Sequence, residues 1–313
     1  MTAAERPLPE ALDRLARSSF KVGRLEPVPG WRFGQWNRSD PRAWVRRLIW
    51  QVAQSRGYDG PVVTDWYLGL KFNHHLTGDI SRCTFVDGRY EPNEMYAMSR
   101  AIGEGMCVVD AGANEGLFTI TAARIVGDAG IVHAFEPSPR ERDRLMANIS
   151  INGLSNVKVH AQALGRAAGR STLRVAAAGH SGHNTMGRFM YASTVQEESI
   201  DVDVVTLDQA AKEQMLTRLD LLKIDVEGSE VELLRGAGDV LRSMRPVVLA
   251  EAQDASLHQM GSSVAELLDL LRSHDYDVQF FGPSGRPEPL VGDQPSSLNL
   301  LCVPSESRTA QTS

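Results

Sequence analysis

VVDAGANEGLF occupies residues 108–118 and joins a run of apolar β-type residues, a glycine-containing turn and the start of a helical pattern. Glycine lets the backbone turn tightly and approach a ligand, and the free N–H groups of a following helix attract negative charge. Such a turn binds a cofactor at the carboxyl edge of a sheet. A nicotinamide fingerprint would need glycine at positions 112, 114 and 117, so Asn114 and Leu117 argue against a dehydrogenase.

The stretches that follow this turn alternate between β-type runs and helical patterns. This alternation is typical of right-handed βαβ units and a parallel sheet. The last two apolar runs have no helix between them, which predicts an antiparallel hairpin at the sheet edge. We therefore expect a Rossmann-like α/β fold with a mostly parallel seven-stranded sheet. The expected strands are 106–110, 131–136, 157–161, 219–225, 247–251, 278–281 and 298–303, and the expected helices are 117–126, 139–152, 229–242 and 263–274.

The first hundred residues do not show this regular alternation of strands and helices. Their pattern predicts an N-terminal α+β extension. Helical spacing of apolar residues is found at 9–17, 42–55 and 91–102, and near alternation at 62–75 predicts short strands. A third strand is expected at 84–86, before an Asp-Gly turn. We expect residues 1–100 to serve as a substrate lid or a dimer contact, and a homodimer through this region is one interpretation of it. Two further alternating runs, 172–176 and 200–205, flank a loop rich in Gly, His, Ser and Asn.

Charge and cysteine content exclude several classes of protein. The chain has 33 basic and 39 acidic residues, a net charge of -6, which argues against nucleic acid as a partner. Cys83, Cys107 and Cys302 are too few and too scattered for a disulfide framework or a cysteine zinc site, so we expect a cytoplasmic protein. No run approaches the ~18 apolar residues that a membrane-spanning helix needs.

A carboxylate ends the strand expected after the glycine turn. Glu136 follows Gly112 by 24 residues and precedes Pro137. Nucleoside-binding folds place an acidic side chain there because it accepts hydrogen bonds from both ribose hydroxyls. Gln162 and Ala163, just past the third strand, lie where an adenine ring is expected.

The spacing Asp110-x-Gly112-x-x-x-Gly116 resembles the first motif of class I S-adenosylmethionine (SAM)-dependent methyltransferases, whose turn faces the methionine end of the cofactor. A second block reads LDLLKIDVEGSE over residues 219–230 and again joins a strand, a turn and a helix. Together with FEP at 135–137 and NLLCVP at 299–304, the two blocks resemble the FkbM-type SAM-dependent methyltransferases over roughly residues 90–304.

This resemblance implies a class I methyltransferase domain at 101–305, followed by a flexible tail at 306–313. It implies SAM as the cofactor and O-methylation of hydroxyls on secondary metabolites, sugars or glycolipids. The cofactor-binding residues it suggests are Asp110, Gly112, Asn114, Gly116, Glu136, Pro137, Gln162, Ala163 and Asp225.

Methyl transfer to an alcohol needs alignment for an in-line displacement and a group that removes a proton. The candidates for that general base are Asp225, Glu227, Glu251 and His183. Asp225 has the best position, at a strand end beside the cofactor turn, but it is also placed to bind the amino group of the cofactor. Glu227 has an alternative role in capping the helix that follows it.

Three of these carboxylates also form a candidate metal site. Asp225, Glu227 and Glu251 would share one edge of the sheet, and oxygen ligands suit Mg²⁺. The alternative is that the carboxylates orient hydroxyls without a metal. A zinc site at His180 and His183 fails for lack of further ligands.

The sequence therefore predicts an O-methyltransferase acting on a small-molecule acceptor with a hydroxyl group. N-methylation of a small-molecule or peptide amine and a catalytically inactive SAM-binding scaffold remain as alternatives.

Overall fold

The computed structural model describes residues 6–306 apart from 34, 79, 190–192 and 291–296, and most of the tail expected at 306–313 lies outside this set. Its centre is an eight-stranded sheet. The strands are β3 (Cys107–Ala111), β4 (Ile131–Phe135), β5 (Val157–His160), β9 (Leu221–Ile224), β10 (Val247–Gln253), β11 (Tyr276–Phe281), β12 (Pro287–Pro289) and β13 (Ser297–Pro304).

The strand order is β12-β11-β13-β10-β9-β3-β4-β5, and the five strands from β10 to β5 are parallel. Read from β5, these five follow the 3-2-1-4-5 order of doubly wound nucleotide-binding folds. The expected Rossmann-like α/β fold is therefore confirmed.

The last two apolar runs pair antiparallel at this side of the sheet, as expected, and the arrangement around them has two further features. The late strand β13 lies between β10 and β11 and is antiparallel to both. The link between the last two apolar runs contains β12, which pairs with β11 and becomes the outermost strand. The expectation of seven strands was wrong. The two prolines of Pro287–Pro289 argue against a strand in the sequence, but proline is tolerated in an edge strand, and β12 is an edge strand.

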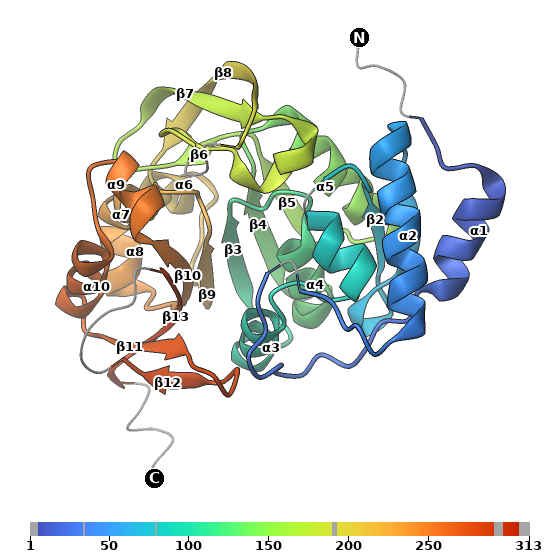
Figure 1. Cartoon of the computed structure of the whole chain (residues 1–313). Coiled ribbons are helices and arrows are strands. Elements are labelled where there is room, and N and C mark those ends of the chain that lie inside the picture. The colour runs from blue at the N-terminus through green and yellow to red at the C-terminus, as the bar shows by residue number, and fades with distance from the viewer. Residues whose placement is uncertain (1–5, 34, 79, 190–192, 291–296, 307–313) are drawn as a thin grey trace.

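Helices cover both faces of the sheet (Figure 1). On one face Val108 packs with Met98 and Ile120, and on the other Val109 packs with Leu233. Burial on both faces explains why these strands read as continuous apolar runs. The helices are α3 (Pro92–Ala101), α4 (Leu117–Val126), α5 (Pro139–Ile151), α6 (Leu207–Glu213), α7 (Glu230–Arg235), α8 (Gly238–Ser243), α9 (Asp254–Gln259) and α10 (Val264–Ser273).

The helix expected at 229–242 is interrupted and forms α7 and α8. At Gly236 a Cβ would lie 2.1 Å from the carbonyl oxygen of Gly165. The two backbone segments are therefore packed too closely for any residue larger than glycine at position 236. The carboxylate of Asp208 then accepts hydrogen bonds from the backbone N–H groups of Asp239 and Val240 at 3.0 and 2.9 Å. This cap starts a new helix.

The N-terminal extension has its own small core and packs against α4 and α5, at the right of Figure 1. Its 84–86 segment is helical, which corrects the expected strand. The apolar side chains of Phe85 and Val86 lie inside the extension, against Ile49 and Ala53. Its elements are α1 (Glu10–Ser19), α2 (Pro41–Arg56), β1 (Val62–Asp65), η1 (Tyr67–Gly69), β2 (Lys71–His74) and η2 (Arg82–Asp87).

Arg46 ties this extension together. Its guanidinium is buried and donates hydrogen bonds to the carbonyl oxygens of Ser19 and Val86, at 2.6 and 3.0 Å. Buried carbonyl groups need such partners, so one side chain of α2 joins the ends of α1 and η2.

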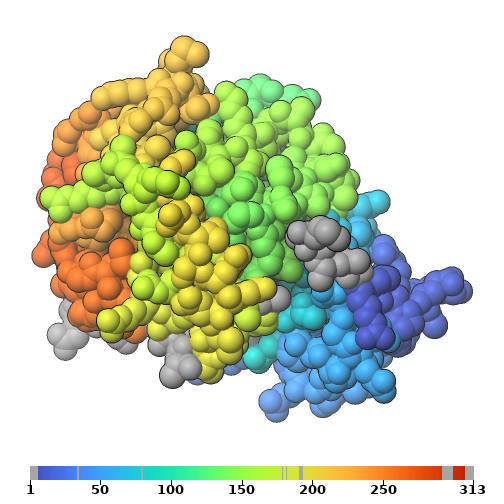
Figure 2. All heavy atoms as spheres, turned by 90° about the horizontal axis from the view of Figure 1, so that it is seen from above, coloured from blue at the N-terminus to red at the C-terminus, as the bar shows by residue number. Residues whose placement is uncertain are grey.

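An insertion after β5 forms a separate three-stranded sheet, β6 (Ala163–Leu164), β8 (Gln196–Val205) and β7 (Gly169–Ala176), with the short helix η3 (Ala178–His183). Figure 2 shows these residues, coloured yellow-green to yellow, over the middle of the face seen from above. Among the described residues, no helix is both long and apolar enough to cross a bilayer. All three cysteines are buried thiols.

Candidate functional site

A cavity of about 800 Å³ lies at the carboxyl ends of the parallel strands. The central sheet, the insertion and the N-terminal extension all contribute to its walls. The lining includes Gly112 after β3, Glu136 after β4, Asp225 after β9, Glu251 in β10, residues 182–186 of the insertion, and Trp31, Phe33 and Tyr90 of the extension.

The turn after β3 depends on a close approach between two strand ends. Gly112 has φ +78°, and a Cβ there would lie 1.8 Å from the carbonyl oxygen of Asp225. The backbone N–H groups of Gly112 and Ala113 both donate to the carbonyl oxygen of Phe135, at 3.0 Å. Only glycine fits this position, and the turn is thereby fixed against both neighbouring strands.

Glu136 is bound to the same turn. Its two carboxylate oxygens accept hydrogen bonds from the backbone N–H groups of Asn114 and Ser138, each at 2.8 Å. Burial, and secondarily the nearby carboxylate of Glu141, raise the pKa of Glu136 to about 8. The side chain is only 6% exposed, and it lines the cavity.

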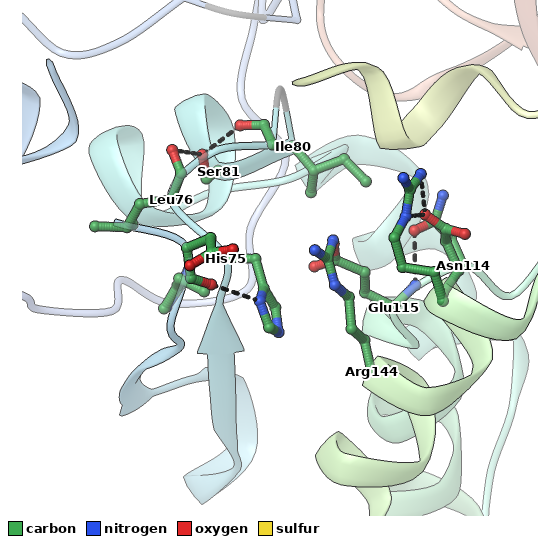
Figure 3. Close-up of polar contacts among 12 residues, drawn as sticks. His75, Leu76, Ile80, Ser81, Asn114, Glu115 and Arg144 are labelled. Atoms are coloured by element: carbon green, nitrogen blue, oxygen red, sulfur yellow. Dashed lines mark hydrogen bonds and ion pairs between the residues drawn. The ribbon is translucent and has the colours of Figure 1, made fainter. Parts of the chain in front are cut away.

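A buried ion pair supports the turn from the side of α5 (Figure 3). Arg144 lies 2.6 Å from Glu115, whose carbonyl oxygen accepts a hydrogen bond from Asn148 at 2.8 Å. The amide oxygen of Asn148 accepts in turn from the backbone N–H of Asn73 in β2. In Figure 3 the imidazole of His75 lies across from this pair. The extension is thus linked by hydrogen bonds to the turn that forms the cavity floor.

Lys223 is buried beneath the cavity between two carboxylates. Its ammonium nitrogen lies 3.1 Å from Asp225 and 3.7 Å from Asp110, and 4.7 Å from the centre of the Phe118 ring. Burial by itself would lower the pKa of Lys223, but the carboxylates of Asp225, Asp110 and Glu91 outweigh burial and raise it. Asp110 therefore faces this lysine and Thr119, to which it is hydrogen-bonded at 2.6 Å, and lies outside the cavity lining.

The turn after β9 is held by Glu230, whose carboxylate accepts from the backbone N–H groups of Gly228 and Val226 at 3.0 and 3.2 Å. Burial raises the pKa of Glu230 to about 7. Glu227 has φ +47°, and its carbonyl oxygen accepts a hydrogen bond from the hydroxyl of Thr185 at 2.7 Å. This bond fixes the insertion over the turn.

The structure brings Asp225, Glu227 and Glu251 together. One ligand oxygen from each lies within 4.8 Å of the others. Burial, and then the charge of Asp225, raise the pKa of Glu251 to about 8, while Gln253 donates a hydrogen bond to it. This cluster is the set that the sequence suggested for proton transfer or for a divalent cation.

The remaining predicted residues divide into two groups. Asn114, Pro137, Ala163 and His183 line the cavity, and the imidazole of His183 is hydrogen-bonded to the hydroxyl of Thr194 at 3.0 Å. Gly116 and Gln162 do not line it. Gly116, with φ +90°, packs on Leu145, where a Cβ would lie 2.4 Å from a methyl carbon, so its role is to let the turn enter α4.

Sequence reasoning missed the wall of the cavity that the extension provides. Tyr90, Glu91 and Glu94 line it near the start of α3, and Asn299 of β13 lies opposite Glu251 in the strand register. Two features of the sequence pointed to these residues. Asn299 begins the NLLCVP motif, and Glu91 precedes a proline at the start of an expected helix. Nothing local to these residues indicates that they meet.

The chain is similar to known methyltransferases. A family model described as "Methyltransferase FkbM domain" matches residues 110–278. "Methyltransferase 1" of Beauveria bassiana (strain ARSEF 2860) is 30% identical over 58% of this chain and 77% of that protein. "31-O-demethyl-FK506 methyltransferase FkbM" of Streptomyces tacrolimicus is 28% identical over 56% of this chain and 74% of that protein. A solved structure, "Methyltransferase FkbM" from Methylobacillus flagellatus KT, is 12% identical with a TM-score of 0.40, covering 83% of this chain and 70% of that one.

The raised carboxyl pKa values predict how stability depends on pH. Between the ordinary value of 4.5 and a folded value of about 8, Glu251 binds more protons in the folded protein than in the unfolded chain. The free energy of unfolding therefore falls as the pH rises through this window, and Glu136 and Glu230 act in the same direction. We expect the melting temperature of the ligand-free protein to fall between about pH 5 and pH 8, and Glu251→Gln to reduce that slope.

The measurement is thermal unfolding across this range. Glu198→Gln is the matched control, because Glu198 is exposed on β8, and it should retain the wild-type slope. A slope that Glu251→Gln leaves unchanged would show that Glu251 ionises normally.

Proposed function

The chain belongs to the FkbM methyltransferase family, and on that premise we propose that it transfers the methyl group of SAM to a hydroxyl of a secondary-metabolite or sugar-containing small molecule. The observation that carries the proposal is one cavity with two chemically different ends. Glu136 and Ala163 line one end and the Asp225–Glu251 carboxylates the other, with the Gly112 turn between them.

The cofactor fits the first of these ends by its chemistry. The carboxylate of Glu136 is oriented by two backbone N–H groups and remains able to accept hydrogen bonds from ribose hydroxyls. Ala163 and Leu164 supply apolar surface for an adenine ring, and Pro137 borders it. Gly112 leaves room for the methionine end to approach the backbone. When bound, SAM supplies an electrophilic methyl group on a sulfonium.

The carboxylates of Asp225 and Glu251 can orient the hydroxyl of the acceptor and receive its proton. One oxygen of Asp225 accepts a hydrogen bond from Lys223 at 3.1 Å, so the orientation of this carboxylate beside the acceptor is fixed. The pKa of about 8 makes Glu251 the better proton acceptor, because a general base works best with a pKa near the working pH. In the reaction the hydroxyl oxygen forms a bond to the methyl carbon, the carbon–sulfur bond breaks, and Glu251 receives the hydroxyl proton.

The first test is binding of S-adenosylhomocysteine by isothermal titration. We expect micromolar binding and no binding of NAD⁺. Glu136→Ala should weaken the binding at least about tenfold, roughly 1.4 kcal/mol, the contribution of a hydrogen bond to a charged group. Glu198→Ala, on the exposed face of β8, should bind as the wild type does. Unchanged affinity in Glu136→Ala would remove the ribose assignment, and absence of any binding would remove methyl transfer.

The second test separates the two carboxylates by the pH dependence of turnover. We expect kcat of the wild type to rise with pH up to about 8, as Glu251 ionises. Glu251→Gln should lower kcat about 10²- to 10⁴-fold and abolish this rise. Asp225→Asn should also lower kcat and should keep a rise, because the base is still present, but the rise should move to lower pH because the charge of Asp225 no longer raises the pKa of Glu251. If the rise of kcat with pH disappears in Asp225→Asn and persists in Glu251→Gln, then Asp225 is the general base and Glu251 orients the hydroxyl.

A divalent cation is a second candidate for the function of the cluster, favoured by the 4.8 Å spacing of the oxygens of Asp225, Glu227 and Glu251. These hard oxygen ligands fit Mg²⁺, which would bind an acceptor diol. This candidate predicts that MgCl₂ titrated into the protein with S-adenosylhomocysteine binds with a measurable heat that Glu227→Gln removes and Glu198→Gln does not. Absence of that heat, together with turnover undiminished by EDTA, would leave the carboxylates acting on the hydroxyl alone.

A further inference from the structure

The cavity carries an excess of acidic side chains over basic ones. The carboxylates in its lining outnumber the basic groups among the described residues. SAM carries one carboxylate and two positive groups, a net charge of +1, so it would compensate at most one ionised carboxylate of the lining. The lining carboxylates are Glu91, Glu94, Glu136, Asp225, Glu227 and Glu251, and the basic side chains are those of Arg32 and His183.

Two of these carboxyl groups, those of Glu91 and Glu94, line the cavity together with aromatic rings. We define this part of the lining by Trp31, Phe33, Tyr90, Glu91 and Glu94 and name it the acidic–aromatic end. Tyr90 and Phe33 meet edge to face with ring centres 6.2 Å apart. Burial, and then the charge of Asp225, raise the pKa of Glu91 well above its ordinary value. This end therefore combines carboxylates with aromatic rings.

Glu94 is the sharpest feature of this end. The residue is 6% exposed, and one carboxylate oxygen accepts a hydrogen bond from the side chain of Asn299 at 2.6 Å. The other oxygen is buried and has no hydrogen-bond partner, although the residue lines the cavity. Burial raises the pKa of Glu94. A buried carboxylate oxygen without a partner is costly, so this position calls for a hydrogen-bond donor from a ligand.

The aromatic wall is held in place by backbone contacts. The backbone N–H of Val28 donates to the side-chain oxygen of Asn93 at 2.7 Å, and that of Gly30 donates to the carbonyl oxygen of Pro283 at 3.0 Å. These bonds fix the segment that carries Trp31 and Phe33 against both the start of α3 and the turn after β11. The rings are therefore positioned before any ligand arrives.

We infer that the acceptor carries a protonated amine, and that the acidic–aromatic end binds this amine while a neighbouring hydroxyl is methylated. The inference rests on the proposed methyl transfer and adds the class of acceptor, an amino sugar or amino alcohol. An ammonium group donates hydrogen bonds to carboxylates and is attracted by aromatic faces. This end is less suited to a divalent cation, because Trp31 and Phe33 offer it no oxygen ligands. A protonated amine has no free lone pair, so it anchors the acceptor and is not the methylated atom.

The experiment measures methyl transfer from methyl-labelled SAM to matched acceptors, with EDTA present. One set is glucosamine, N-acetylglucosamine and glucose, and a second is 2-aminocyclohexanol and cyclohexane-1,2-diol. We expect kcat/KM for the free amine to exceed that for the uncharged members by at least about tenfold, the effect of one charged hydrogen bond. The product should carry the methyl group on oxygen, which NMR determines.

Two variants test the residues. Glu94→Gln keeps an oxygen for Asn299 but removes the charge, and it should reduce the preference for the amine about tenfold while leaving S-adenosylhomocysteine affinity unchanged. Glu91→Gln serves as the second variant if Glu94→Gln fails to fold. Glu198→Gln should behave as the wild type.

The outcomes distinguish this inference from the proposed function. Failure of S-adenosylhomocysteine to bind would overturn the methyl transfer itself. If S-adenosylhomocysteine binds, then equal or faster methylation of the uncharged members, methylation on nitrogen, or no product from any amine would overturn only the amine inference. Preference for the amine that survives in Glu94→Gln and in Glu91→Gln would also overturn it.

Discussion

The contact between Gly112 and the carbonyl oxygen of Asp225 is the constraint on which the site depends. It joins the turns that follow β3 and β9, the two strands at the centre of the parallel sheet. Any side chain at position 112 would force these turns apart, and the groups that face each other across the cavity would separate with them. The hydrogen bonds from this turn to Phe135 and Glu136 extend the same constraint to β4. Three strand ends therefore form one rigid support for the part of the cavity that Gly112 and Glu136 line.

Lys223 provides the electrostatic counterpart of this support. A lysine buried among carboxylates is stable only if they compensate the loss of hydration, and Asp225 and Asp110 do so at 3.1 and 3.7 Å. The arrangement places a fixed positive charge under the cavity and fixes the orientation of Asp225. Among the residues that the structure describes, no basic side chain forms an ion pair with Glu251 or Glu94, and burial raises the pKa of both carboxyl groups. The carboxylates that form ion pairs with Lys223 are thus distinguished from those whose pKa is raised by burial.

Much of the fold could be predicted from the sequence because its signals are local. The bounds of α4 match the expected 117–126, and the carboxylates after β4 and β9 lie at the cavity as their strand-end positions suggested. The secondary-structure predictions were wrong where contacts between residues distant in the sequence determine the local structure. The apolar 84–86 segment is helical because it fills the core of the extension, and α7 ends where Gly236 meets a distant carbonyl group. Glu94 and Asn299 form a pair 205 residues apart in the chain, which no local pattern indicates.

The position of β13 has a consequence for how the protein is made. This strand enters the sheet between β10 and β11, although almost every other element precedes it in the chain. Until it is synthesised, the apolar edge of β10 is open, and an open edge is a template for pairing with other chains. Asn299 also arrives with β13, so the cavity wall is incomplete during most of translation. The open edge of β10 is therefore closed only when β13 is in place, so the last strand of the chain both completes the cavity wall and removes a site for unwanted strand pairing.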